Sequence, residues 1–128
     1  MLNVCSKKGI YKELTLCLIG SEEIKITQSD FDIVVCSACM IKGHLPNSCF
    51  EVFLSVLKQN SVMVFSIRDI YMNSETDSGM GYHLKLAELE NSNVLKKLEH
   101  KKYTKYKGLA FGAGYQEESA NIFVFEKI

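Results

Sequence analysis

Residues 31–67 read FDIVVCSACMIKGHLPNSCFEVFLSVLKQNSVMVFSI, and this stretch decides the fold. It begins with FDIVVCS, in which positions 33–35 are three β-branched residues in succession. Such a run, apolar on both faces, is typical of a strand covered on both sides, as in a parallel sheet. A second run of this kind, SVMVFSI, occupies residues 61–67. Because the residues between the two runs have a helical pattern, the stretch predicts a βαβ unit with a right-handed crossover.

The helix between the two strands follows a loop at residues 38–47. Ser48 and Glu51 match the S-x-x-E capping box that marks many helix starts. Apolar side chains then recur at helical intervals, at Phe50, Phe53, Leu54 and Leu57. We expect the helix to end within residues 58–60, since Asn60 can adopt the left-handed conformation.

The flanking segments are assigned by the same patterns. Residues 2–14 predict one short helix, residues 15–20 (TLCLIG) predict a short strand, and residues 21–30 are a polar connection. Beyond the βαβ unit, residues 68–81 are polar enough for a surface loop. Residues 82–90 then predict a second crossover helix, in which Tyr82, Leu86 and Leu89 form one stripe.

The last part of the chain predicts a hairpin. Residues 94–106 are typical of a strand whose exposed face is lysine, and residues 121–128 of another strand. A glycine-bearing loop, residues 108–120, joins them. Because no helix separates these strands, we expect them to pair antiparallel.

Composition limits the class of protein. The chain has 128 residues, 47% of them hydrophobic and 23% charged, which predicts one compact domain that folds without a metal. Fifteen basic and fifteen acidic side chains cancel, so a protein built mainly to bind nucleic acid is not expected. No run reaches the roughly 18 apolar residues of a membrane span, and no signal-peptide core is present. These features predict a cytoplasmic protein without membrane attachment.

The five cysteines support a reducing compartment, because their number is odd and the chain has no secretion signal. Four residues nevertheless match the zinc-knuckle spacing C-x2-C-x4-H-x4-C, namely Cys36, Cys39, His44 and Cys49. Gly43 lies where a metal-binding turn needs a residue without a side chain. Against zinc, Cys36 continues an apolar strand and Cys49 lies in the first turn of the predicted helix. We therefore favour cysteines that act as small hydrophobic residues, and keep the zinc site as the alternative.

The same region resembles the class I S-adenosylmethionine-dependent methyltransferases, and within them it is most similar to the methyltransferase-like protein 27 (Williams–Beuren-region) family. The resemblance covers nearly all 128 residues. Its most particular part is the Gly-His-Leu-Pro stretch at residues 43–46. The other residues that carry it are Phe31 and Asp32 at the first strand, Leu57 and Lys58 at the helix end, and Arg68 after the second strand.

The resemblance implies a Rossmann-like three-layer α/β sandwich whose last two strands form an antiparallel hairpin. It also implies that Ser37, Ala38 and Cys39 line the site of the cofactor S-adenosyl-L-methionine at the carboxyl end of a central strand. His44 would face the substrate and is the candidate catalytic base. The alternative reading of these residues is backbone geometry, packing and a surface histidine.

The chain departs from the family pattern in the cofactor-binding elements. The glycine-rich turn after the first strand and the acidic residue ending the second are missing. The family has a further cofactor-contacting acidic residue, and that position aligns with Leu18 here, or with Glu22 in a shifted alignment. Gln59, Asn60 and Ser61 stand where the family has a Pro-Gly-Gly turn. We therefore expect residues 1–128 to form a single, N-terminally incomplete methyltransferase-like domain with impaired activity.

Two remaining patterns have simpler explanations than a binding site. The segment GLAFGAG at residues 108–114 could replace the missing turn, but it precedes YQEESAN and not an apolar helix, so a hairpin loop is favoured. The lysines at 96, 97, 101, 102, 105 and 107 alternate with Tyr103 and Tyr106. They could bind RNA, but a solvated strand that discourages edge pairing is favoured.

Three functions follow from the sequence. The first is a methyltransferase acting on a small-molecule or protein substrate that the residues do not identify. The second is a non-catalytic, methyltransferase-like domain that binds a partner or self-associates through an exposed strand edge, that of residues 31–35. The third is a zinc-knuckle RNA-binding module.

Overall fold

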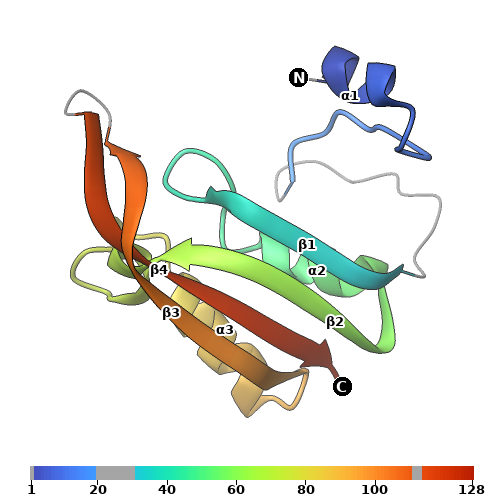
Figure 1. Ribbon diagram of the computed structural model, residues 1–128. Helices are drawn as coiled ribbons and strands as arrows, with labels where there is room; N and C mark the ends of the chain where they lie inside the picture. The colour runs from blue at the N-terminus through green and yellow to red at the C-terminus, as the bar shows by residue number, and fades with distance from the viewer. Residues whose placement is uncertain (1, 20–30, 111–113) are drawn as a thin grey trace.

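The structure is a computed structural model that describes residues 2–19, 31–110 and 114–128, without the side chains of residues 105–110 and 114–117. Figure 1 shows how the elements are arranged. In chain order they are α1 (Leu2–Lys8), β1 (Phe31–Met40), α2 (Cys49–Val56), β2 (Leu57–Arg68), the 3-10 helix η1 (Asp69–Met72), α3 (Tyr82–Asn91), β3 (Leu95–Ala110) and β4 (Gly114–Lys127).

The four strands form one mixed sheet in the order β1-β2-β4-β3. Strand β1 pairs parallel with β2, which confirms the predicted βαβ unit. Strand β4 is inserted between β2 and β3 and runs antiparallel to both, so the predicted antiparallel hairpin is also confirmed. Strands β1, β2 and β3 therefore point in one direction, and their carboxyl ends meet at one end of the sheet (Figure 1).

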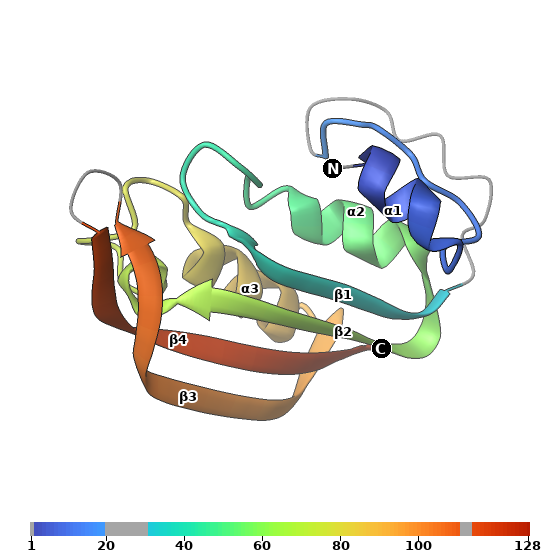
Figure 2. The same ribbon diagram turned by 45° about the horizontal axis from the view of Figure 1, so that its top comes forward.

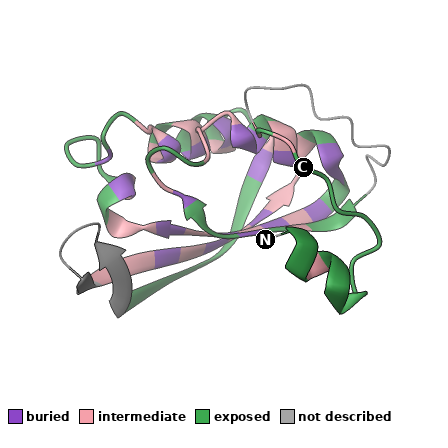
Figure 3. Ribbon diagram, turned by 90° about the horizontal axis from the view of Figure 1, so that it is seen from above, coloured by how far each residue is buried: buried purple, intermediate pink, exposed green. Residues whose placement is uncertain are grey.

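Helices α2 and α3 cover the same face of the sheet (Figures 2 and 3). The core lies between them and the strands, because alternate strand side chains point to that face. The buried positions on β2 are Leu57, Ser61, Met63, Phe65 and Ile67. The Phe65 ring lies 5.4 Å from that of Phe50 on α2 and 5.8 Å from that of Phe125 on β4.

The opposite side of the sheet, which we call the outer face, is not covered by a helix within the described residues. Ile33 is 51% exposed and Val35 is 67% exposed. The prediction that the β1 run is covered on both sides is therefore wrong for the part of the chain that the structure describes. The sequence shows correctly that both faces of β1 are apolar. Whether a second element packs on the outer face depends on segments distant in the chain, which the local pattern does not reveal.

The predicted capping box of α2 does not form. Ser48 is the N-cap residue, but it has a helical φ of −64° and makes no side-chain capping hydrogen bond. Glu51 instead pairs with Lys85 Nζ on α3 at 2.6 Å. The helix ends at Val56 and β2 follows at once, so residues 57–60 are strand and not helix. Asn60 does take the predicted left-handed conformation, with a φ of +61°.

Other segment boundaries also differ from the predictions. Helix α1 ends at Lys8, because Gly9 takes a left-handed conformation with a φ of +63°. Residues 15–19 do not form the predicted strand, and Gly20 lies outside the described residues. The predicted loop at 108–120 is mostly strand, with pairs such as Gly108 with Gln116. Within the described residues, no helix has the length and apolar character needed to cross a membrane.

Candidate functional site

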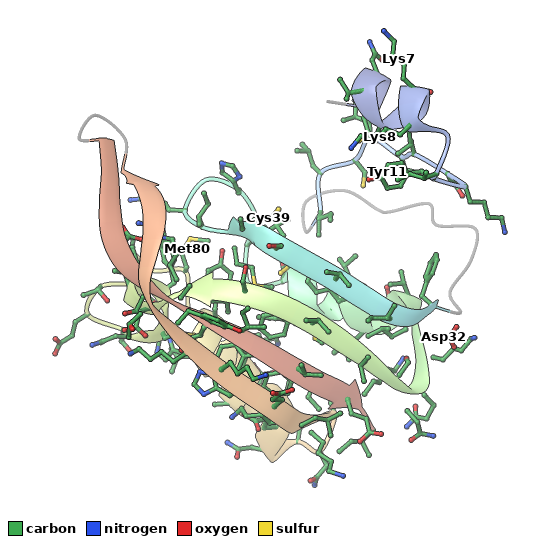
Figure 4. All side chains as sticks on the ribbon, viewed as in Figure 1. Lys7, Lys8, Tyr11, Asp32, Cys39 and Met80 are labelled. Carbon is green, nitrogen blue, oxygen red and sulfur yellow. The ribbon has the colours of Figure 1, made fainter. Side chains whose placement is uncertain are left out.

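The first part of the candidate site is the carboxyl end of β1, where Ser37, Ala38 and Cys39 lie. Open α/β sheets bind ligands at this end of their parallel strands. Ala38 has a φ of +58°, and its N–H donates a hydrogen bond to Ser66 Oγ on β2 at 3.0 Å. Cys39 is exposed and its thiol donates to the Ser37 carbonyl at 3.2 Å. Figure 4 shows Cys39 at the end of β1, and Asp32 at the other end of the strand.

The loop after β1, residues 41–47, is held from the side of α3 and η1. The Lys42 N–H donates to the Tyr71 hydroxyl at 3.2 Å, and the buried Tyr82 hydroxyl donates to the Leu45 carbonyl. His44 is part of a turn in which its N–H donates to the Ile41 carbonyl at 3.1 Å. The His44 side chain is exposed. The loop therefore has a fixed course and presents His44 to solvent.

The residues of the alternative zinc site occupy different environments. Cys36 and Cys49 are buried, whereas Cys39 and His44 are exposed. Burial raises the pKa of the Cys36 thiol to about 12, and the charge of Cys39 adds to the effect. Burial also raises the pKa of the Cys49 thiol to about 12. Among the described residues, the structure contains no group of three or more metal-ligating side chains placed to hold an ion.

The second part of the site is a cavity of about 450 Å³ just beyond the carboxyl end of β2. It lies between η1, the loop that follows η1, and the start of the described side chains of β4. Its lining residues are Asp69, Ile70, Met72, Asn73, Thr76, Glu118 and Ser119. The lining is rich in oxygen acceptors and hydroxyl groups, which suits a polar ligand.

Charged groups fix the walls of this cavity. Arg68, the last residue of β2, donates through Nε and Nη2 to the two carboxylate oxygens of Glu118 on β4. Asp69 accepts from Lys102 Nζ at 2.8 Å and from Asn121 Nδ2 at 3.0 Å. These two bonds, that from Lys102 first, lower the pKa of the Asp69 carboxyl. Both carboxylates of the cavity are therefore already paired with a cation.

A Ser-His-Asp cluster joins the loop after η1, which carries Ser74 and Asp77, to the first turn of α3, which carries His83. Ser74 Oγ is 2.8 Å from His83 Nε2, and His83 Nδ1 is 3.6 Å from Asp77 Oδ2. Nδ1 is buried and has no hydrogen-bond partner within the described residues. The Asp77 carboxylate accepts instead from the backbone N–H groups of Gly79 and Gly81. Without the bond from histidine to aspartate, the cluster lacks the orienting contact that activates a catalytic serine.

The lysines of β3 are paired with carboxylates. Lys102 pairs with Asp69, as described above. The others pair Lys96 with Glu126 at 3.7 Å, Lys97 with Glu90 at 3.0 Å and Lys101 with Glu99 at 3.0 Å. The side chains of Lys105 and Lys107 lie outside the described residues. The described lysines thus carry local counter-charges, which reduces the positive field that a phosphate backbone would meet.

The structure brings Ser37, Ala38 and Cys39 together at one strand end and places His44 on the loop that follows. Sequence reasoning missed the contacts by which Ser66, Tyr71 and Tyr82 hold this region, and it missed the cavity beside η1. Ser66 had a recognisable signal, because it interrupts the apolar run of β2 near its carboxyl end. The cavity had none, since Asp69 and Glu118 are distant in the sequence and meet only through the pairing of β2 with β4.

No protein-family model and no curated protein matches this chain. Among solved structures, the chain is similar to the N-methyltransferase NodS from Bradyrhizobium japonicum WM9, whose crystal structure is a complex with S-adenosyl-L-homocysteine. The TM-score is 0.51, at 14% sequence identity, over 82% of this chain and 50% of the NodS chain. The chain thus spans about half the length of that neighbour. The likeness establishes a methyltransferase-like α/β fold, while membership of the methyltransferase-like protein 27 family stays a prediction.

The described residues could contact S-adenosyl-L-methionine along one side of the cofactor, at the carboxyl end of β1, and do not surround it. The strand end offers the Ser37 hydroxyl, but the Ala38 N–H is already bonded to Ser66 and the Cys39 thiol to Ser37. The cavity beside η1 is not lined by any of these three residues. The described part of the chain therefore does not enclose a cofactor of this size, although it supplies a wall that one could contact.

Proposed function

We propose that this chain is the substrate-side part of an S-adenosylmethionine-dependent methyltransferase, with methyl transfer impaired in the chain as it stands. The observation that carries the proposal is the sheet itself. Three strands run parallel, and an antiparallel strand inserted before the last of them completes the order β1-β2-β4-β3. The likeness to an N-methyltransferase crystallised with S-adenosyl-L-homocysteine supports this assignment. The resemblance of residues 43–46 to the methyltransferase-like protein 27 family supports the finer one.

In this proposal the complete fold is a three-layer sandwich that the present chain forms only in part. The third layer would pack on the outer face, where Ile33 and Val35 are exposed. Further strands would continue the sheet from β1, and would bring the glycine-rich turn that the sequence lacks. We expect a cytoplasmic protein, on the ground of its cysteine content.

The chain's own residues would have two tasks. Ser37, Ala38 and Cys39 would contact the cofactor, and the cavity beside η1 would hold a polar substrate group. His44 is a candidate base, since its exposed side chain lies in the loop that follows the strand end. Methyl transfer depends mainly on positioning and on exclusion of water. The fixed loop course set by Tyr71 and Tyr82 suits that requirement.

The test is a titration of the 15N-labelled chain with S-adenosyl-L-homocysteine, followed by amide chemical shifts. We expect weak, saturable shifts centred on residues 37–39. Cys39→Tyr should abolish the shifts because it fills the exposed strand end. Leu84→Tyr, at a 62% exposed position on α3, is the matched control and should leave them unchanged. Absence of shifts at millimolar ligand, or shifts that Cys39→Tyr does not alter, would overturn the proposal.

A further inference from the structure

The cavity beside η1 is lined mainly by side chains that accept hydrogen bonds. The carboxylates of Asp69 and Glu118 accept hydrogen bonds and donate none. Thr76 is left as an acceptor, because its hydroxyl proton is donated to a backbone carbonyl of η1 at 2.6 Å. The donors among the described lining side chains are the amide of Asn73 and the hydroxyl of Ser119. A ligand that donates hydrogen bonds therefore fits this lining better than one that accepts them.

The two carboxylates retain capacity for a ligand although both are paired with a cation. Arg68 donates one hydrogen bond to each oxygen of Glu118. Lys102 and Asn121 donate one each to the two oxygens of Asp69. Because a carboxylate oxygen can accept two hydrogen bonds, each oxygen retains one lone pair beyond these described contacts. Neither Arg68 nor Lys102 belongs to the described lining, so the charged groups of the cavity wall itself are the anions.

Two apolar side chains complete the lining. Ile70 is 41% exposed, and Met72 is partly buried against the core. They offer contact to the hydrocarbon part of a ligand. The cavity volume of about 450 Å³ is in the range of small-molecule sites. The cavity therefore suits a small molecule that has a short hydrocarbon part and a group that donates hydrogen bonds.

The cavity lies at the end of the sheet to which residues 37–39 belong. Strands β1 and β2 are parallel neighbours, so their carboxyl ends lie side by side (Figure 1). Neighbouring strands are about 4.8 Å apart. A molecule held beyond the end of β2 can therefore extend to the end of β1, where the cofactor is proposed to bind.

We propose that this cavity binds the protonated amine of a small-molecule substrate and anchors that substrate beside the carboxyl end of β1. The inference rests on the proposed methyltransferase function and names its substrate class. An ammonium group has three donors, no acceptor, and a charge opposite to that of the lining carboxylates. A carboxylate or phosphate group would instead meet like charge in the cavity wall.

The anchored amine is not the group that receives the methyl. Nearby carboxylates favour the charged form of an amine. Methyl transfer forms the new bond with a lone pair of the acceptor, while the electron pair of the carbon–sulfur bond stays with the sulfur. An ammonium nitrogen has no lone pair to supply. The substrate is therefore an amine that carries a second nucleophilic group, and this second group reaches residues 37–39.

The test is an NMR titration of the 15N-labelled chain at about pH 7.5, where alkylamines are protonated. The three probes share one hydrocarbon chain and differ in a single group: butylamine, butanol and butyrate. We expect butylamine to cause saturable amide shifts at residues 69–76 and 118–119, with a dissociation constant at least tenfold lower than that of either other probe. Equal binding of butanol or butyrate, or no saturable shift with butylamine, overturns the proposal.

Matched lysine variants test whether the amine occupies this cavity. Ser119→Lys places a cation in the lining and should weaken butylamine binding at least tenfold. Ser55→Lys adds the same charge at an exposed position of α2 and should leave binding unchanged. Circular dichroism shows whether the variants fold, and Asn73→Lys provides a second lining variant if Ser119→Lys does not. Undiminished binding in a folded lining variant overturns the proposal.

A linear diamine with eight carbons tests the second nucleophile. It should shift residues 37–39 in addition to the cavity, whereas butylamine should not, and shifts confined to the cavity would exclude a second group at that strand end. No cofactor is added in these titrations. If S-adenosyl-L-homocysteine shifts residues 37–39 but butylamine does not bind, only the amine anchor is excluded. If butylamine binds but S-adenosyl-L-homocysteine does not, the methyltransferase function falls and the role as a substrate anchor falls with it.

Discussion

Ala38 has a φ of +58°, a conformation that L-amino acids with a side chain adopt rarely and at a cost of roughly 1 kcal/mol or more. The hydrogen bond from its N–H to Ser66 Oγ holds it there. Strained residues of this kind are found most often at ligand sites and switches. The strain lies at the strand end that the sequence had identified for the cofactor, although that role itself remains a prediction.

The three cysteines of the candidate site should react with thiol reagents at different rates. Because burial raises the pKa of Cys36 and Cys49 to about 12, these thiols carry almost no thiolate at pH 8. Cys39 is exposed. We expect a thiol reagent such as dithiobis-nitrobenzoate to modify Cys39 rapidly and to reach the other two only after unfolding. Cys39→Ser should remove one fast thiol, and rapid modification of Cys36 in the native chain would contradict the assignment.

Asp77 makes stability depend on pH in the acid range. The N–H groups of Gly81 and Gly79 lower the pKa of its carboxyl in the folded chain. Its stabilisation is therefore fully present above the unfolded pKa of about 3.9 and is lost as the pH falls through the lower folded value. We expect the melting temperature of the native chain to fall below about pH 4 more steeply than that of Asp77→Asn. Glu75→Gln, at an exposed loop position, is the control, and an equal slope in all three proteins would refute the expectation.

Helix α2 is joined to β4 by one side chain at its carboxyl end. Lys127 Nζ donates to the carbonyls of Leu54 and Leu57, both at 2.8 Å. Free carbonyls at a helix end attract a cation, and such contacts satisfy groups that the helix leaves unpaired. The last strand therefore fixes the position of the first crossover helix.

Removal of that cation should weaken the contact between α2 and β4. Lys127→Met keeps most of the aliphatic stem but leaves two carbonyls without their donor. We expect a loss of about 1 to 2 kcal/mol in the free energy of unfolding, measured by urea denaturation. Lys96→Met is the matched control, because Lys96 is exposed on β3 and should change stability by less than about 0.5 kcal/mol. Equal losses in the two variants would exclude this role for Lys127.

The elements that the sequence predicted correctly are those with long, uninterrupted patterns. The β1 and β2 runs, the helix between them and the lysine-bearing hairpin all depend on residues close in the chain. The capping box failed because Glu51 finds Lys85, a residue of another helix, within reach. The cover of β1 and the cavity beside η1 could not be inferred, since both depend on segments that meet only in three dimensions.

At the scale of the whole molecule, the Phe65 ring joins the sheet to the helical layer in the described core. Phe65 is buried on β2 and its ring adjoins those of Phe50, Phe123 and Phe125. Phe65→Ala would leave a cavity bordered by a helix and two strands. We expect a loss of about 3 to 5 kcal/mol in the free energy of unfolding, a large part of the typical 5–15 kcal/mol total. Tyr103→Ala, at a 48% exposed position, should cost less than about 0.5 kcal/mol. A small effect of Phe65→Ala would show that the layers are not packed through this ring.

The insertion of β4 between β2 and β3 has a consequence for how the protein is made. In the described sheet β3 is hydrogen-bonded to β4 alone, and β4 is formed by residues 114–127. On the ribosome, β3 therefore emerges before the strand that joins it to its neighbours. Such long-range pairing slows folding. A nascent chain halted before residue 114 would expose β3 and the bare edge of β2 to chaperones and to aggregation.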